Sequence, residues 1–167
     1  MDAGQRFANQ LEVVPLREDG DAQECARLMS TSEPWITLGR SFETSLAILR
    51  DPDREVYLAR DANGIAGFLI LCMTGAFVGY IQTICVHPRC RGRGLGSKLV
   101  EFAEERILRV SPNIFMCVSS FNEGARRLYE RLGYTVVGEL TDYIVPGQSE
   151  ILLRKTRGPL ADFSASR

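Results

Sequence analysis

Hydrophobic residues follow two different periods along the chain, and the order of these periods indicates a mixed α/β fold. Apolar residues recur at the spacing of an amphipathic helix in four segments, at residues 22–29, 42–49, 99–110 and 125–132. Short apolar, β-branched and aromatic runs between turn signals predict seven strands, at residues 11–16, 55–60, 65–73, 77–87, 114–118, 134–140 and 150–154.

The order of these elements predicts how the strands pair. Turns such as Asp61-Ala62-Asn63-Gly64 join neighbouring strands as antiparallel hairpins. The helix between the fourth and fifth strands requires a parallel crossover. The predicted fold class is α/β (mixed α+β), with a central mixed, mostly antiparallel sheet of about seven strands flanked by about four helices. In the fourth strand, alternation places residues 80, 82, 84 and 86 on one face.

The chain has 167 residues, which suits one domain with its own core. We assign residues 1–155 to this single domain. Residues 1–10 are polar and are expected to be loosely held, and residues 156–167 are expected to form a mobile C-terminal tail.

Residues 62–88 contain no Asp, Glu, Lys or Arg, and this stretch is long enough to span a bilayer. Glycines at 64, 67, 75 and 79 interrupt it, and residues 73–75 have the composition of a turn. Two adjacent buried strands therefore explain the stretch better than a membrane helix, and we expect no membrane partner.

The formal net charge of −1 gives no general reason to expect nucleic acid as a partner. The five cysteines form no C-x-x-C motif, and the N-terminus has no apolar signal core. Together these features predict a reducing, cytoplasmic location.

A glycine- and arginine-rich segment follows the fourth strand and precedes a helix. Glycines at 92, 94 and 96 let the backbone approach an anion closely, and the helix start adds unpaired N–H groups. Arginines at 89, 91 and 93 supply charge for phosphate. The segment is therefore expected to hold a diphosphate.

The spacing of the glycines in this segment distinguishes between the common glycine-rich loop motifs. The P-loop pattern is absent, and G-x-G-x-x-G from Gly92 ends on Ser97 instead of glycine. What remains is R-x-x-G-x-G at Arg91, Gly94 and Gly96, followed by N-x-x-A-x-x-x-Y-x-x-x-G-[FY] over residues 122–134. These two motifs, in this order, resemble those of the GNAT superfamily of acyl-CoA N-acyltransferases.

The resemblance implies an N-acetyltransferase that uses acetyl-CoA as cosubstrate and no metal. It implies that the fourth and fifth strands splay apart after a bulge and that pantetheine lies between them. It implies Tyr129 as general acid to the CoA thiolate, and a backbone N–H at Cys85 or Val86 as oxyanion donor. The CoA-binding residues carried over are Ile84, Cys85, Val86, Arg91, Gly92, Arg93, Gly94, Leu95, Gly96, Ser97, Asn122, Ala125 and Tyr129.

The general base is where the sequence departs from the family pattern. Many members carry a glutamate on the fourth strand, whereas this chain has Tyr80, Gln82 and Ile84 there. The proton of the amine would then pass to a remote carboxylate, for which the candidates are Glu33, Glu55, Asp142 and Glu150. An acceptor amine of low pKa, such as a peptide α-amine near ~7.8, is the other option.

The resemblance places the acceptor site at the loops of residues 32–40 and 141–149. The acceptor would be a primary amine of a small molecule, peptide or protein, and the family makes a homodimer possible. The residues proposed to contact the acceptor are Glu33, Trp35, Gln82, Asp142 and Tyr143, and their acidic members favour a cationic acceptor. Arg40 is either a carboxylate-binding residue or a solvated charge at a helix start.

Three other interpretations stay open at this stage. His87 is a strand-end cap or a base, and a covalent route through Cys85 is conceivable. Cys85, His87 and Cys90 lack a fourth partner for zinc. The alternative functions are a non-catalytic acyl-CoA-binding or sensing module and a nucleotide-binding regulator.

Overall fold

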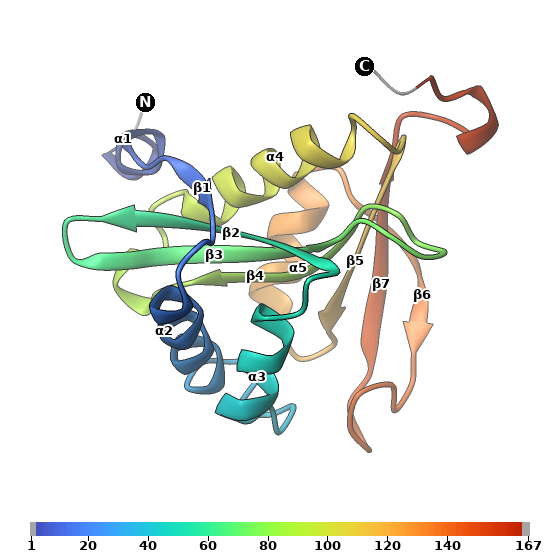
Figure 1. The fold of residues 1–167 in the computed structure, drawn as a ribbon. Coiled ribbons are helices and arrows are strands. Elements are labelled where there is room, and N and C mark those ends of the chain that lie inside the picture. The colour runs from blue at the N-terminus through green and yellow to red at the C-terminus, as the bar shows by residue number, and fades with distance from the viewer. Residues whose placement is uncertain (1–2, 165–167) are drawn as a thin grey trace.

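Seven strands form one sheet in the computed structural model, which describes residues 3–164 (Figure 1). Their order is β1-β2-β3-β4-β5-β7-β6, and every neighbouring pair is antiparallel except β4 and β5. The predicted fold class and strand number are therefore confirmed. The strands are β1 (Val13–Pro15), β2 (Arg54–Asp61), β3 (Gly64–Cys72), β4 (Tyr80–Val86), β5 (Asn113–Ser119), β6 (Thr135–Leu140) and β7 (Glu150–Thr156).

The helices cover both faces of this sheet, with α2 and α3 on one side and α4 on the other (Figure 1). The α-helices among the described residues are α1 (Ala3–Gln10), α2 (Asp19–Ser30), α3 (Phe42–Leu49), α4 (Leu95–Ile107) and α5 (Glu123–Arg131). Two short 3-10 helices are η1 (Pro88–Cys90) and η2 (Leu160–Asp162). The sheet separates two apolar clusters, one under α4 and α5 and one under α2 and α3.

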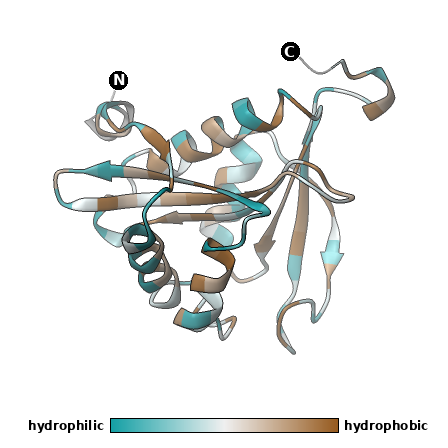
Figure 2. Cartoon of the chain, in the orientation of Figure 1, coloured by the Kyte–Doolittle hydropathy of each residue, from teal (hydrophilic) through white to brown (hydrophobic). Residues whose placement is uncertain are grey.

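The predicted helical stripes are the buried faces of the helices. In α2 the buried residues are Ala22, Cys25, Ala26 and Met29, as their spacing predicts. The uncharged stretch forms β3 and β4, and β3 is buried from Ile65 to Leu71 between the two helical layers (Figure 2). Within residues 3–164, no helix combines the length and the hydrophobicity needed to cross a membrane.

Strands β4 and β5 pair only between the first two residues of β4 and the middle of β5, and then diverge (Figure 1). Tyr80 is opposite Phe115 and Ile81 is opposite Met116, and no later pair is formed. The register of β4 against β3 also shifts, so that Gln82 is an extra residue between Ile81 and Thr83. The splayed strands and the bulge implied by the resemblance are both present.

The bulge makes the simple alternation predicted for β4 wrong. Ile81 packs in the same apolar cluster as Ile84 and Val86, on the side of α4. Cys85 packs in the other cluster, on the side of α2 and α3. One extra residue reverses the facing of every side chain that follows it.

The expectation that residues 1–10 are loosely held is not met where the structure describes them, because residues 3–10 form α1, and residues 1–2 lie outside the described residues. Ala8 is fully buried, and Lys98 Nζ donates a 2.7 Å hydrogen bond to the Ala8 carbonyl. Arg93 stacks on Phe7, with its Cζ 3.4 Å from the ring centroid. These contacts hold α1 against the start of α4.

The predicted domain boundary at residue 155 lies one residue before the end of β7, and the domain assignment stays a prediction. Thr156 ends β7, and Arg157 N–H donates to the Pro112 carbonyl over 2.9 Å. The last residues of the predicted mobile tail, 165–167, lie outside the described residues, so its mobility stays a prediction.

Candidate active site

A pocket of about 490 Å³ lies at the opening between β4 and β5, and we call it the central pocket. Five segments contribute to it: the loop before α3, β4, the end of β5, α5 with its N-cap, and residues 143–150. Its lining residues are Pro34, Trp35, Leu38, Arg40, Tyr80, Gln82, Thr83, Ile84, Cys117, Val118, Ser119, Asn122, Ala125, Tyr129, Tyr143, Ile144 and Glu150.

The central pocket brings together many residues that the sequence singled out from distant segments. These are Trp35, Gln82, Ile84, Asn122, Ala125, Tyr129 and Tyr143. Sequence reasoning missed several others, among them Cys117 and Ser119 of β5. Their only sequence signal is the alternation of apolar and polar residues in a short strand. This alternation does not show that the end of β5 is separated from β4.

Tyr129 lies in α5 with its side chain turned inward. Its residue is 8% exposed, and its ring makes an edge contact with Tyr134 at a centroid distance of 6.2 Å. Burial raises the pKa of Tyr129 to about 12, so the phenol is protonated throughout the neutral range. A protonated hydroxyl beside the opening between the strands is suited to the role of general acid.

The residues that start and end α5 hold Tyr129 in place. Asn122 Oδ1 accepts a 3.3 Å hydrogen bond from Ala125 N–H, which confirms the predicted N-cap. Gly133 has φ +90° and ends the helix, as predicted. This Asn122 contact is compatible with a second one to a ligand, because the Asn122 side-chain amide still has two N–H donors.

The glycine-rich loop, residues 91–97, turns the backbone into the start of α4. Gly92 and Gly94 have φ values of +70° and +78°, which side chains disfavour. The first i to i−4 bond of α4 runs from Lys98 N–H to the Gly94 carbonyl. The N–H groups of residues 95–97 therefore precede the bonded turn, and Gly94 has no side chain to cap them. This geometry fits an anion such as the CoA diphosphate.

The three arginines around this loop have different surroundings. Arg91 is exposed and uses its Nε to donate a 3.3 Å hydrogen bond to the Val86 carbonyl, which leaves the rest of its guanidinium available. Arg93 lies on Phe7, and that contact would have to be shared or given up for it to bind phosphate.

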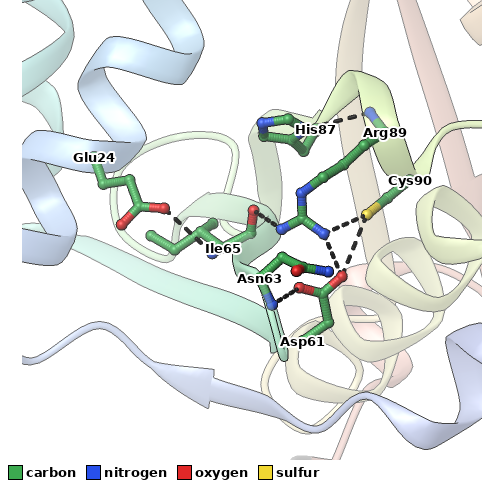
Figure 3. A network of polar contacts seen from close by, with 7 residues as sticks. All are labelled: Glu24, Asp61, Asn63, Ile65, His87, Arg89 and Cys90. Atoms are coloured by element: carbon green, nitrogen blue, oxygen red, sulfur yellow. Dashed lines mark hydrogen bonds and ion pairs between the residues drawn. The ribbon is translucent and has the colours of Figure 1, made fainter.

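Arg89 is not a phosphate ligand in this arrangement (Figure 3). Its guanidinium pairs with Asp61 and donates a 3.0 Å hydrogen bond to the Ile65 carbonyl. The hydrogen bond from Arg89 to Asp61 holds the pKa of the Asp61 carboxyl below its usual value. His87 Nδ1 accepts a 3.2 Å hydrogen bond from Arg89 N–H, so the histidine caps the end of β4. The charge of Arg89 ties the loop to the β2–β3 hairpin, which argues against the expected phosphate contact.

The remaining residues of the loop and of β4 lie outside the central pocket. Leu95 is buried in the core, so only its backbone can meet a ligand. Cys85 is 1% exposed, and burial raises the pKa of its thiol to about 12. A thiol that stays protonated is a poor nucleophile, which argues against a covalent route. The oxyanion donor at Cys85 or Val86 stays a prediction.

Two predicted acceptor residues, Glu33 and Asp142, do not line the central pocket. Glu33 Oε2 accepts a 3.2 Å hydrogen bond from Thr37 N–H within its own loop. Asp142 Oδ1 accepts a 2.6 Å hydrogen bond from Gly147 N–H. Each carboxylate stabilises a turn, so the expected acidic wall is not formed.

Only Glu150, among the four candidate carboxylates for the base, lines the central pocket. Glu55 lies outside the pocket, where it pairs with Arg106 and accepts a hydrogen bond from Tyr57. Glu150 is 4% exposed and accepts a 2.6 Å hydrogen bond from Ser119 Oγ. Burial raises the pKa of Glu150, and the Ser119 hydrogen bond and the nearby Arg40 oppose that shift.

Comparisons with known proteins agree with this geometry. Residues 22–134 match the family model described as Acetyltransferase (GNAT) family. Acetyltransferase Atu2258 of Agrobacterium fabrum is 31% identical over 103 residues, which cover 62% of this chain and 73% of that protein. N-alpha-acetyltransferase RimI of Mycobacterium tuberculosis is 29% identical over 150 residues, covering 83% and 88%.

A solved structure shares the fold at lower identity. An aminoglycoside 6'-N-acetyltransferase complexed with coenzyme A superposes with a TM-score of 0.69 at 18% identity. The match covers 89% of this chain and 98% of that chain.

Proposed function

Because the chain belongs to the GNAT acetyltransferase family, we propose that it transfers the acetyl group of acetyl-CoA directly to a primary amine. One observation carries this proposal. A protonated phenol, Tyr129, and a buried carboxylate, Glu150, line the same pocket at the opening between β4 and β5. Acyl transfer from a thioester to an ammonium is aided by a base that takes the amine proton and by an acid that protonates the departing thiolate.

The glycine-rich loop is the proposed site for the diphosphate of CoA. The N–H groups of residues 95–97 and the guanidinium of Arg91 would hold it, and Asn122 would contact the neighbouring part of the molecule. Bound there, acetyl-CoA supplies the activated acetyl group as a thioester.

Glu150 is the proposed acceptor of the amine proton, directly or through water. An alkylamine with a pKa of ~10.4 is mostly protonated at pH 7, and presenting it neutral costs about 5 kcal/mol. A carboxylate whose pKa is raised by burial is a better base than an ordinary one. The amine nitrogen then bonds to the acetyl carbon, and the carbon–sulfur bond breaks.

Tyr129 is the proposed donor of a proton to the departing thiolate. Its hydroxyl is protonated at neutral pH and has no hydrogen-bond acceptor among residues 3–164. The phenolate that results regains its proton from solvent. The net reaction converts an amine and a thioester into an amide and a thiol.

Thermal unfolding with acetyl-CoA, CoA, ATP or NAD, followed by thiol release with a panel of amines, tests this function. Stabilisation by the CoA compounds alone, together with acceptor-dependent thiol release, supports an N-acetyltransferase. Stabilisation without release by any amine would favour the non-catalytic CoA-binding alternative. Stabilisation by ATP or NAD in place of acetyl-CoA would contradict both.

A further inference from the structure

We propose that the acceptor amine carries a carboxylate, and that Arg40 binds this carboxylate in the central pocket. The inference rests on the proposed function and adds the chemical class of its acceptor. It replaces the cationic acceptor that the sequence favoured.

Arg40 is a half-buried cation without a side-chain partner. Its backbone N–H donates to the Trp35 carbonyl over 2.9 Å, but its guanidinium makes no hydrogen bond or ion pair within the described part of the chain. Burial is the main cause that lowers the pKa of Arg40. A desolvated guanidinium with unused donors is unfavourable unless another group satisfies it.

The other half-buried arginines of the described chain all have side-chain acceptors. Their acceptors are Gln82 Oε1 at 2.9 Å for Arg54, Glu55 for Arg106, Glu130 for Arg126 and Asn113 Oδ1 for Arg154. Arg40 differs from them in facing a pocket. Its missing acceptor is therefore expected to come from the ligand that occupies that pocket.

Arg40 and Glu150 are the only charged side chains that line the central pocket among residues 3–164. They interact through space, but no ion pair within 4 Å joins them. An ammonium near Glu150 and a carboxylate near Arg40 would satisfy both charges. A polyamine would bring several positive charges to one carboxylate and one arginine.

The positions of Glu33 and Asp142 support the same conclusion. Both carboxylates bind backbone N–H groups of their own loops, and neither reaches the pocket lining. The remaining walls mix apolar side chains, such as Trp35, with uncharged polar ones, such as Gln82 and Thr83. A pocket of about 490 Å³ with one cation and one carboxylate suits a small molecule that carries both an amine and a carboxylate.

Matched acceptors test the proposal. Each of several amino acids would be compared with its carboxamide and with the decarboxylated amine, with spermidine as a polycation, by acetyl-CoA-dependent thiol release. The wild type is expected to use the carboxylate form with the highest kcat/KM. Arg40→Gln is expected to raise KM for that form about 10- to 100-fold, with kcat and the KM of the carboxamide little changed.

Two variants serve as controls. Arg40→Lys keeps the charge and should recover part of the lost KM, whereas Arg109→Gln removes an exposed arginine outside the central pocket and should change nothing. Equal effects of Arg40→Gln on all acceptor forms would overturn the proposal.

The acceptor inference and the proposed function can fail separately. Preference for spermidine, or turnover of carboxamides better than acids, would overturn the inference and leave an acetyltransferase. The inference would also be overturned if acetyl-CoA stabilised the protein but no carboxylate-bearing amine caused thiol release. Absence of any stabilisation by acetyl-CoA would overturn the proposed function itself.

Discussion

Ser119 Oγ donates a 2.6 Å hydrogen bond to Glu150 Oε1, which joins the end of β5 to the start of β7 at the wall of the central pocket. The two residues face each other across an antiparallel pair, in which Ser119 is directly opposite Glu150. Both residues are buried. The bond gives one buried carboxylate a fixed position, and it leaves the second carboxylate oxygen for the pocket.

Replacing Glu150 by Gln should separate activity from stability. We expect kcat to fall about 10²- to 10⁴-fold, because the amine loses its proton acceptor. The amide can still accept the Ser119 hydrogen bond, so the fold should be retained. Steady-state kinetics together with thermal unfolding measure the two effects. An unchanged kcat would remove Glu150 from the proposed mechanism.

The stability of the same variant should depend on pH in a defined direction. The pKa of Glu150 is raised above its ordinary value of 4.5, so the folded state binds the proton more tightly than the unfolded state. The contribution of Glu150 to stability therefore decreases as pH rises from about 4.5 through the raised pKa. Relative to wild type, Glu150→Gln should gain stability from pH 4 to pH 8. A gain in the opposite direction would contradict the raised pKa.

Ser119→Ala should shift the pH profile of activity but should not abolish activity. The Ser119 hydrogen bond lowers the pKa of Glu150, so its loss should raise that pKa further. The acidic limb of the kcat/KM profile is then expected to shift to higher pH. An unshifted limb would mean that Glu150 does not control it.

Tyr129→Phe should lower kcat about 10²- to 10⁴-fold with little change in the Kd of CoA. The substitution keeps the ring against Tyr134 and removes only the hydroxyl. Because the pKa of Tyr129 is about 12, the wild type should show no loss of activity from Tyr129 ionisation below about pH 10. Isothermal titration with CoA and kinetics at several pH values check both expectations. Loss of CoA affinity in parallel with kcat would indicate a binding role.

Arg89 and Arg91 offer a matched pair around the glycine-rich loop. Arg91→Met should weaken CoA binding about 10-fold, because one charge-assisted contact to phosphate is lost. Arg89→Met should leave CoA binding nearly unchanged and cost about 1 kcal/mol of stability, because its partners are Asp61 and the Ile65 carbonyl. Titration of CoA and chemical unfolding of both variants distinguish the roles. The reverse pattern would restore Arg89 as the phosphate ligand.

Gly79 and Gly75 test how closely the turn before β4 packs on α4. Both have positive φ, at +88° and +85°, so alanine should cost about 1 to 2 kcal/mol at either position. A Cβ at Gly79 would lie 2.7 Å from the Asn113 carbonyl and closer still to Ile107, whereas at Gly75 it would meet nothing. Gly79→Ala should therefore cost about 1 to 3 kcal/mol more. Equal unfolding midpoints for the two variants would contradict the close contact.

Local patterns predicted the secondary structure well because they report on neighbouring residues. The stripe in α2, the Asn122 cap and the Gly133 helix end are each properties of a few consecutive residues, and all three are present. The first residues were misjudged because α1 depends on contacts from the distant Arg93 and Lys98. Polar composition alone does not show such contacts.

The sequence by itself determined the element order, the glycine-rich loop and the position of Tyr129, because these depend on spacing along one segment. Only the tertiary structure decided which charges face the central pocket. Arg89, Glu33 and Asp142 bind groups of their own loops or of a neighbouring hairpin, while Arg40 and Glu150 both line the central pocket. The physical reason is that a charged side chain takes its role from the groups that surround it. The separation of β4 from β5, which no local pattern reports, leaves the opening at which the central pocket lies.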